Sequence, residues 1–151
     1  MNIERCEDLI DWTRKAHALL ADSMAEGAKD RNDSLAKMLL DYLAQHEREL
    51  AATIERVKDH AEPSALQTPL HDAVQGNALT LDIDSETFAT ISVDQVSQEV
   101  FALHNRIIDL YRSLERRREL HKASALLDEV LQLEERETKR LAHQVNRMHE
   151  M

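Results

Sequence analysis

A chain of 151 residues has room for one folded domain with a single core, and its composition favours helices over sheets. Aromatic residues make up only 3% of the chain, whereas the helix-favouring residues Ala, Leu, Glu, Arg and Gln are frequent. The formal net charge of −10 argues against binding to nucleic acid or to anionic membranes, because both attract clustered positive charge.

The cellular compartment is predicted from features that the sequence lacks. The single cysteine, Cys6, allows no internal disulfide bond, which suits a reducing environment. No apolar run approaches the length of about 18 residues that a membrane-spanning helix requires. The segment MNIERCEDLIDW is acidic, whereas a secretion signal has a basic stretch followed by an apolar one. We therefore expect a cytoplasmic protein without a membrane or nucleic-acid partner.

The first two helices are predicted from apolar residues that recur at steps of three and four. The first covers about residues 3–28. The second covers about 34–61, between a cap at Asp33 or Ser34 and the helix-breaking Pro63. The periodic face of the first helix contains Cys6, Leu9, Ile10, Thr13, His17, Leu20 and Met24. The face of the second contains Leu35, Leu39, Leu43, Leu50, Ile54 and Val57, with Glu47 or His46 in the same phase.

A segment of different composition follows, over about residues 62–92. It holds both prolines and one of the two glycines of the chain. Its alternating pieces ALTLDID and TFATIS are compatible with a small hairpin, and a short helix is compatible with residues near 67–75. Most connections between packed helices are far shorter, so we interpret this segment as a crossover from one end of the helices to the other.

Two further helices are predicted over about residues 93–118 and 122–149. The face of the third contains Val96, Val100, Ile107, Tyr111 and Leu114, with Leu103 or His104 between them. The face of the fourth contains Leu127, Leu131, Thr138, Leu141, Val145 and Met148, with Glu134 or Glu135. Short connections within each pair and a long one between the pairs predict an all-α four-helix bundle of two antiparallel hairpins, in one domain covering residues 1–151.

Helices two and four share a phrase, YLAQHEREL and VLQLEERET, which places Glu47 and Glu135 at matching positions. The chain resembles the rubrerythrin-like branch of the ferritin-like superfamily. Three segments carry the resemblance, one each on helices two, three and four: AKMLLDYLAQHERELAATI, HNRIIDLYRSLERR and ALLDEVLQLEERETKRL. The resemblance lies in the pattern of all four helices more than in residue identity. It implies a ferritin-like bundle with two metal ions, held by a Glu on helices one and three and by Glu-x-x-His on helices two and four.

The departures from that pattern imply that the di-iron site is lost. Leu50 and Thr138 stand where the family has its two histidines, and His104 stands where helix three has its Glu. On helix one an alignment without gaps places Arg14 at the Glu position, and a shift of one turn places His17 there instead. Of the six family ligands, only Glu47 and Glu135 remain.

Two interpretations of these residues are left open. In the first, Arg14, Glu47, His104 and Glu135 form a vestigial polar cluster, in which the arginine compensates the carboxylates. In the second, Glu47, His104 and Glu135 hold a single zinc or iron ion, joined by His17 or His46. A positively charged Arg14 in the same pocket would oppose the second arrangement. If neither holds, the glutamates belong to charged helix surfaces and His104 is a hydrogen-bonded core residue.

We therefore expect a non-enzymatic helper or interaction protein that has no cofactor and forms a homodimer. The dimer is inferred by analogy and from four apolar residues outside the periodic faces: Trp12, Leu19, Leu40 and Phe101. One alternative is a metalloprotein with a reduced iron or zinc site, used for storage or for oxygen or peroxide chemistry. Another is a helical adaptor or signalling bundle unrelated to ferritins.

Overall fold

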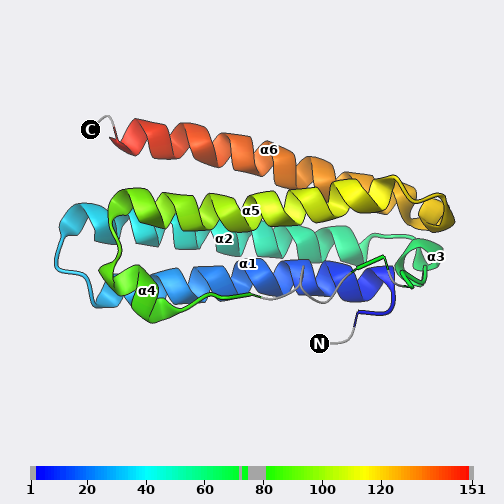
Figure 1. Cartoon of the computed structure of the whole chain (residues 1–151), viewed down its shortest axis with the longest axis horizontal. Coiled ribbons are helices and arrows are strands. Elements are labelled where there is room, and N and C mark those ends of the chain that lie inside the picture. Colours follow the sequence, from blue (N-terminus) through cyan, green and yellow to red (C-terminus); the bar gives the residue numbers. More distant parts are fainter. Residues whose placement is uncertain (1–2, 72, 75–80, 150–151) are drawn as a thin grey trace.

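Four long helices lie side by side in the computed structural model, which describes residues 3–71, 73–74 and 81–149 (Figure 1). They are α1 (Cys6–Lys29), α2 (Ser34–Asp59), α5 (Val93–Glu115) and α6 (Ser124–His149). Two short helices, α3 (Pro63–Leu66) and α4 (Ser85–Thr90), lie between α2 and α5, and a 3₁₀ segment (Arg118–Ala123) precedes α6. No strand occurs among the described residues, so the predicted all-α class is confirmed.

The ends of the long helices are set by local chemistry. At the start of α1 the carboxylate of Asp8 accepts from the backbone N–H groups of Glu4 and Arg5, at 3.1 and 3.0 Å. At the start of α5 the side chains of Ser92 and Gln95 each bond to the other's backbone N–H, at 3.2 and 3.0 Å. Before α6 the backbone of Leu120 is not helical, with φ −100° and ψ 18°. The third helix therefore ends at Glu115, three residues before the predicted boundary near 118.

The crossover contacts both ends of α1. At one end, the backbone N–H of Cys6 donates to the carbonyl of Thr68, and that of Leu70 donates to the carbonyl of Glu4, both at 2.9 Å. At the other end, α4 packs against the last turn of α1. In Figure 1 this path lets α2 (cyan) and α5 (green to yellow) run in the same direction, opposite to α1 and α6.

A glycine and an arginine hold the far end of the crossover in place. A Cβ atom added at Gly27 would lie 2.7 Å from Cβ of Phe88 and 2.9 Å from the carbonyl oxygen of Ser85. The absence of a side chain therefore permits the close contact between α1 and α4. Arg31, in the turn between α1 and α2, donates to the carbonyls of Phe88 and Ile91 at 3.1 and 2.5 Å, and pairs with Asp33 at 2.9 Å.

Two local expectations for the crossover are wrong. The piece TFATIS was expected as a strand, but α4 covers most of it, capped by the Asp84 side chain, which accepts from the N–H of Glu86 at 3.0 Å. The short helix expected near 67–75 lies earlier, at Pro63–Leu66, because proline suits the first turn of a helix. Of the piece ALTLDID, residues 78–80 lie outside the described residues.

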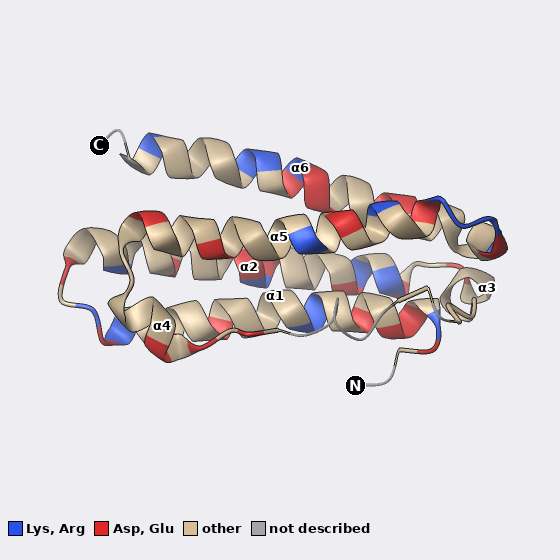
Figure 2. Cartoon of the chain, in the orientation of Figure 1, with Lys and Arg blue, Asp and Glu red and all other residues tan. Residues whose placement is uncertain are grey.

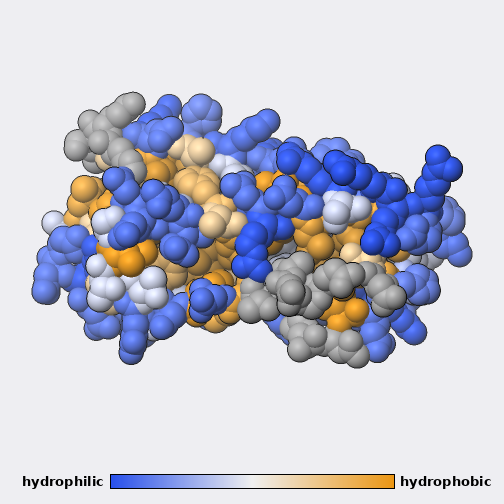
Figure 3. All heavy atoms as spheres, in the orientation of Figure 1, coloured by the Kyte–Doolittle hydropathy of each residue, from blue (hydrophilic) through white to orange (hydrophobic). Residues whose placement is uncertain are grey.

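The core is a continuous apolar cluster between the long helices. Charged residues of both signs are spread along all four long helices (Figure 2), and of these Glu47 and Glu134 are buried among the described residues. In Figure 3 hydrophilic residues cover much of the face shown, with apolar residues visible between them. Of the four residues expected to form a dimer surface, Trp12 and Leu40 are buried in this core, Phe101 is half-buried, and Leu19 is exposed. In the part of the chain that the structure describes, no helix has the length and apolar character needed to cross a membrane.

Candidate functional site

Among the described residues, four histidine and glutamate side chains are fully buried in the core, one from each long helix. They are His17 on α1, Glu47 on α2, His104 on α5 and Glu134 on α6, each with 0% of its surface exposed. We refer to these four residues as the buried cluster. Burying charged or polar groups is unfavourable unless they are paired, so their convergence at one point demands an explanation.

His17 lies between the two carboxylates. Its Nδ1 atom is 3.2 Å from Oε2 of Glu47, and its Nε2 atom is 2.6 Å from Oε1 of Glu134. A carboxylate only accepts hydrogen bonds, so both ring nitrogens act as donors in this arrangement. His17 is therefore an imidazolium, and it joins α1 to both α2 and α6.

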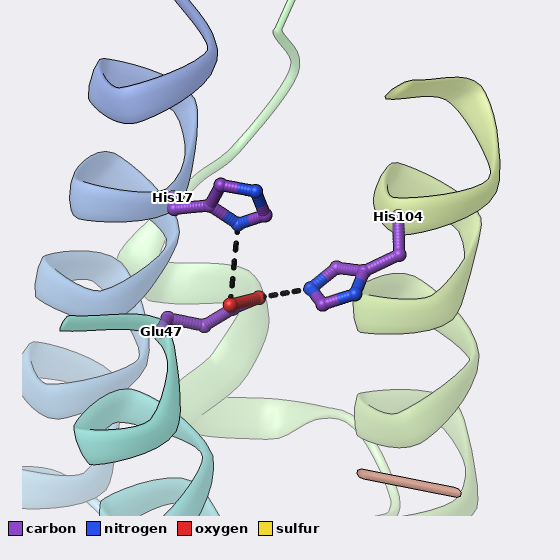
Figure 4. Close-up of side chains that lie close together, drawn as sticks. All are labelled: His17, Glu47 and His104. Carbon is purple, nitrogen blue, oxygen red and sulfur yellow. Dashed lines mark hydrogen bonds and ion pairs between the residues drawn. The ribbon is translucent and has the colours of Figure 1, made fainter. Parts of the chain in front are cut away.

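Glu47 lies between the two histidines, as Figure 4 shows. Its Oε1 atom accepts a hydrogen bond from Nε2 of His104, while its Oε2 atom faces His17. The Nδ1 atom of His104 is 2.8 Å from the hydroxyl of Thr138 on α6. The rings of His17 and His104 meet edge to face, with their centroids 5.1 Å apart.

The proton affinities in the cluster follow from these contacts. Burial alone would lower the pKa of His17, but the carboxylates of Glu134 and Glu47 outweigh it and raise the pKa to about 10. Burial alone would raise the pKa of Glu47, but the adjacent His104 and His17 lower it well below its ordinary value. His17 and Glu47 thus form a charged pair in the interior at neutral pH.

Two polar atoms of this region have no hydrogen-bond partner among the described residues. One is Oε2 of Glu134, which is buried together with the rest of its side chain. The other is Nδ1 of His46, on α2 beside Glu47, which lies 3.9 Å from Oε2 of Glu47. On its other side, Nε2 of His46 is 3.5 Å from Oε2 of Glu137 on α6. Buried atoms without a partner are rare in proteins, and they often mark a place where a water or an ion binds.

The structure brings together only two of the four residues predicted to cluster. Glu47 and His104 contact each other as expected. Arg14, by contrast, is 31% exposed and pairs with Glu55, with its Nε atom 2.9 Å from Oε2. Glu135 is 34% exposed, and its Oε1 atom lies 3.5 Å from Arg112. The two remaining positions of the cluster are taken by His17 and Glu134.

The helical phase explains both differences. Successive residues of a helix point about 100° apart, so an inward Glu134 directs Glu135 away from the centre. Glu134 follows Val130 by four residues and precedes Leu141 by seven, and both of these are fully buried. His17 was already part of the periodic face of the first helix. The apolar periodicity of the helices could have identified His17 and Glu134. The alignment to the family pattern selected Arg14 and Glu135 instead.

The donor set of the buried cluster fits a transition-metal ion. One ligand atom from each of His17, Glu47 and His104 lies within 4.8 Å of the other two. Two ligands of one zinc ion, each about 2.0–2.2 Å from it, are separated by about 3–4 Å, so a small closure of the side chains would suffice. Imidazole and carboxylate groups together suit zinc and iron.

Comparison of the chain with protein-family models, with curated proteins and with solved structures finds no match.

Proposed function

We propose that the chain is a metal-binding protein whose buried cluster holds one divalent ion, zinc or iron. His17, Glu47 and His104 would be its ligands, and Glu134 would hold the His17 ring in place from its other nitrogen. The observation that carries this proposal is that four side chains of this chemistry, each fully buried, converge from four different helices. Carboxylates that accept from the second ring nitrogen of a metal-bound histidine are common in metal sites.

The position of Arg14 removes the main objection to a metal ion. A guanidinium among these ligands would repel a dication, but Arg14 lies at the surface with Glu55. The positive charge inside the cluster is instead the proton of His17, which is exchangeable. A metal ion would displace the proton on Nδ1, between His17 and Glu47, and would leave the hydrogen bond from Nε2 to Glu134 in place.

The arrangement of the helices supports a ferritin-like fold as part of the same proposal. The long connection contacts both ends of α1, and α2 and α5 run in the same direction, as in bundles with one long connection. Each long helix contributes one residue to the centre, which is how metal sites in such bundles are built. A helical adaptor needs neither a long connection between its second and third helices nor a polar residue from each helix at its centre.

A second candidate is a protein that has lost its metal and serves as a helper or interaction protein. The ion pairs of His17 with Glu47 and Glu134, and of His104 with Glu47, favour it because they satisfy most polar atoms of the cluster without any ion. In that case the cluster would fix the register of the four helices and would have no chemical role.

Metal content and binding distinguish these two candidates. The protein would be purified without added metal, analysed for bound elements, and titrated with Zn²⁺ and, without oxygen, with Fe²⁺. The metal-binding proposal predicts one ion per chain and a rise in the unfolding temperature on loading. The conservative variant Glu47→Gln should lose the ion, whereas Glu135→Gln should keep it.

Circular dichroism of each variant would show that it is folded before binding is compared. Binding no stronger in the wild type than in Glu47→Gln would overturn the proposal and favour the metal-free helper.

A further inference from the structure

A groove runs along the surface between α2 and α6, beside the buried cluster. Its volume is about 500 Å³, which is within the usual range of ligand sites. On α2 it extends from Tyr42 to Arg56, and on α6 from Glu137 to Gln144. It therefore opens on the side of the molecule opposite to the crossover's contacts with α1.

One side chain separates this groove from the cluster. His46 lines the groove, is 12% exposed, and has its Nδ1 atom 3.9 Å from Oε2 of Glu47. Its ring also stacks loosely on the ring of His104, with the centroids 6.5 Å apart. No other residue in the described part of the chain both lines the groove and makes an ion-pair contact with a member of the cluster.

The polar contacts of His46 are long. Its Nδ1 atom has no hydrogen-bond partner in the described part of the chain. Its Nε2 atom is 3.5 Å from Glu137, beyond the distance of a good hydrogen bond. One nitrogen of the ring therefore lies on the side of Glu47 and the other on the side of Glu137, and no strong hydrogen bond occupies either of them.

We propose that His46 and Glu137 form an access site, where a cation from solvent first binds before it passes to the buried cluster. The cation would be held by an imidazole nitrogen of His46 and a carboxylate oxygen of Glu137, which suit zinc and iron. Rotation of the His46 ring then brings the cation to Glu47. This inference rests on the proposed function, and it concerns the route of loading.

Two arginines beside Glu137 bear on the same route. Arg140, which lines the groove, has its Nη1 atom 3.9 Å from Oε2 of Glu137, and Arg136, which does not line it, is 4.0 Å from Oε1. The Arg140 side chain is 71% exposed, so the pair is weak, but its positive charge faces an arriving cation. Removal of Arg140 should therefore accelerate loading, whereas removal of Glu137 should slow it.

A competing route exists on the other face. A cavity of about 180 Å³ is lined by Leu20, one turn beyond His17, and by Leu103, next to His104. Asp82, Asp84 and Glu99 lie at this cavity, together with Arg106. A cation that used this route would pass none of the residues of the groove.

The rate of loading tests the access site separately from the metal site itself. Co²⁺, a coloured substitute for Zn²⁺, would be mixed rapidly with metal-free protein, and the rate and the final affinity would both be measured. His46→Ala and Glu137→Gln should slow loading on the order of tenfold, the size typical of a charged cleft. Their equilibrium affinities should stay within about twofold of the wild type, because neither residue is a ligand in the final site.

Arg140→Ala should load faster than the wild type, whereas Glu99→Gln and the exposed Glu135→Gln should load at its rate. Unchanged rates in His46→Ala and Glu137→Gln, or slow loading only in Glu99→Gln, would overturn the access site while leaving the metal site intact. Faster loading in His46→Ala would also overturn it, since the ring would then be an obstacle. Failure of all variants and of the wild type to bind Co²⁺ would instead overturn the proposed function.

Discussion

His17 and Glu134 are 117 residues apart in the sequence, and their side chains meet in the interior with Nε2 and Oε1 2.6 Å apart. This contact joins the first long helix to the last. It also brings the second carboxylate to a histidine that already contacts Glu47. The positive charge of His17 is therefore balanced by the negative charges of Glu47 and Glu134, and metal binding and stability should both depend on this balance.

Replacement of Glu134 by Gln should weaken metal binding by at least about tenfold, since even residues that only support metal ligands contribute that much. The amide has the shape of the carboxylate but lacks its charge. Isothermal titration with Zn²⁺ would measure the change. The matched control is Glu135→Gln, because Glu135 is the next residue on the same helix and lies at the surface. Equal losses in the two variants would contradict the placement of Glu134 at the centre.

The stability of the metal-free protein should depend on pH on both sides of a maximum. The pKa of His17 is raised from 6.5 to about 10, so its contribution is complete below about pH 6.5 and is lost as the pH rises toward 10. The pKa of Glu47 is lowered from 4.5, so its contribution is complete above about pH 4.5 and is lost in acid. These two groups therefore favour a maximum between about pH 4.5 and 6.5.

Thermal unfolding between pH 4 and 10 would measure this dependence, with metal removed beforehand. His17→Gln should lose most of the decline on the alkaline side. His143→Gln, at an exposed position of α6, should keep the profile of the wild type. An alkaline decline that persists in His17→Gln would show that another group causes it.

Two arginines, Arg14 within α1 and Arg31 in the turn after it, should differ sharply in their importance. Arg14→Ala should change the free energy of unfolding by no more than about 1 kcal/mol, because its pair with Glu55 is partly exposed. Arg31→Ala should cost about 2–3 kcal/mol, because its guanidinium joins Asp33 to two backbone carbonyls and is largely covered. Urea unfolding of both variants would compare them, and a larger loss for Arg14→Ala would return Arg14 to the cluster.

Gly27→Ala should destabilise the protein even though alanine favours helices. The helix would gain about 1 kcal/mol from the substitution at an unconstrained position. The new Cβ atom would, however, lie 2.7 Å from Cβ of Phe88, and overpacking of this kind costs about 1–3 kcal/mol. A lower urea midpoint is therefore expected. An increase in stability would mean that α4 is not packed tightly against α1.

The predictions from sequence succeeded where local chemistry governs the structure. Steps of three and four predicted four long helices, and the observed α1, α2, α5 and α6 lie at those places. The scarcity of glycine, proline and aromatic residues indicated the all-α class. This prediction also succeeded because the preference of a residue for a helix acts locally, within its own segment of the chain. The crossover was inferred from its length, but the short helix considered for it was misplaced and α4 was not predicted, so neither short helix was located. Their positions depend on contacts with α1, such as that between Phe88 and Gly27.

The site shows the limit of the same reasoning. The repeated phrase of helices two and four paired Glu47 with Glu135, but the structure turns Glu134 inward. Neighbouring residues on a helix differ by about 100° in direction, so an alignment that is displaced by one residue selects a side chain on another face. The choice between Arg14 and His17 was a shift of one turn, about 60° around the helix, and the packing of α1 decided it for His17.

The sequence by itself determined the helical class and the approximate extent of the long helices, and it proposed Glu47 and His104 for the centre while leaving His46 and Leu103 open as the inward residues. Only the tertiary structure decided which glutamate of α6 and which residue of α1 complete the buried cluster. The physical reason is that helix formation depends on neighbours within a few residues, whereas the rotation of each helix is fixed by packing against the other three. The contact between His17 and Glu134 therefore exists only in the folded chain.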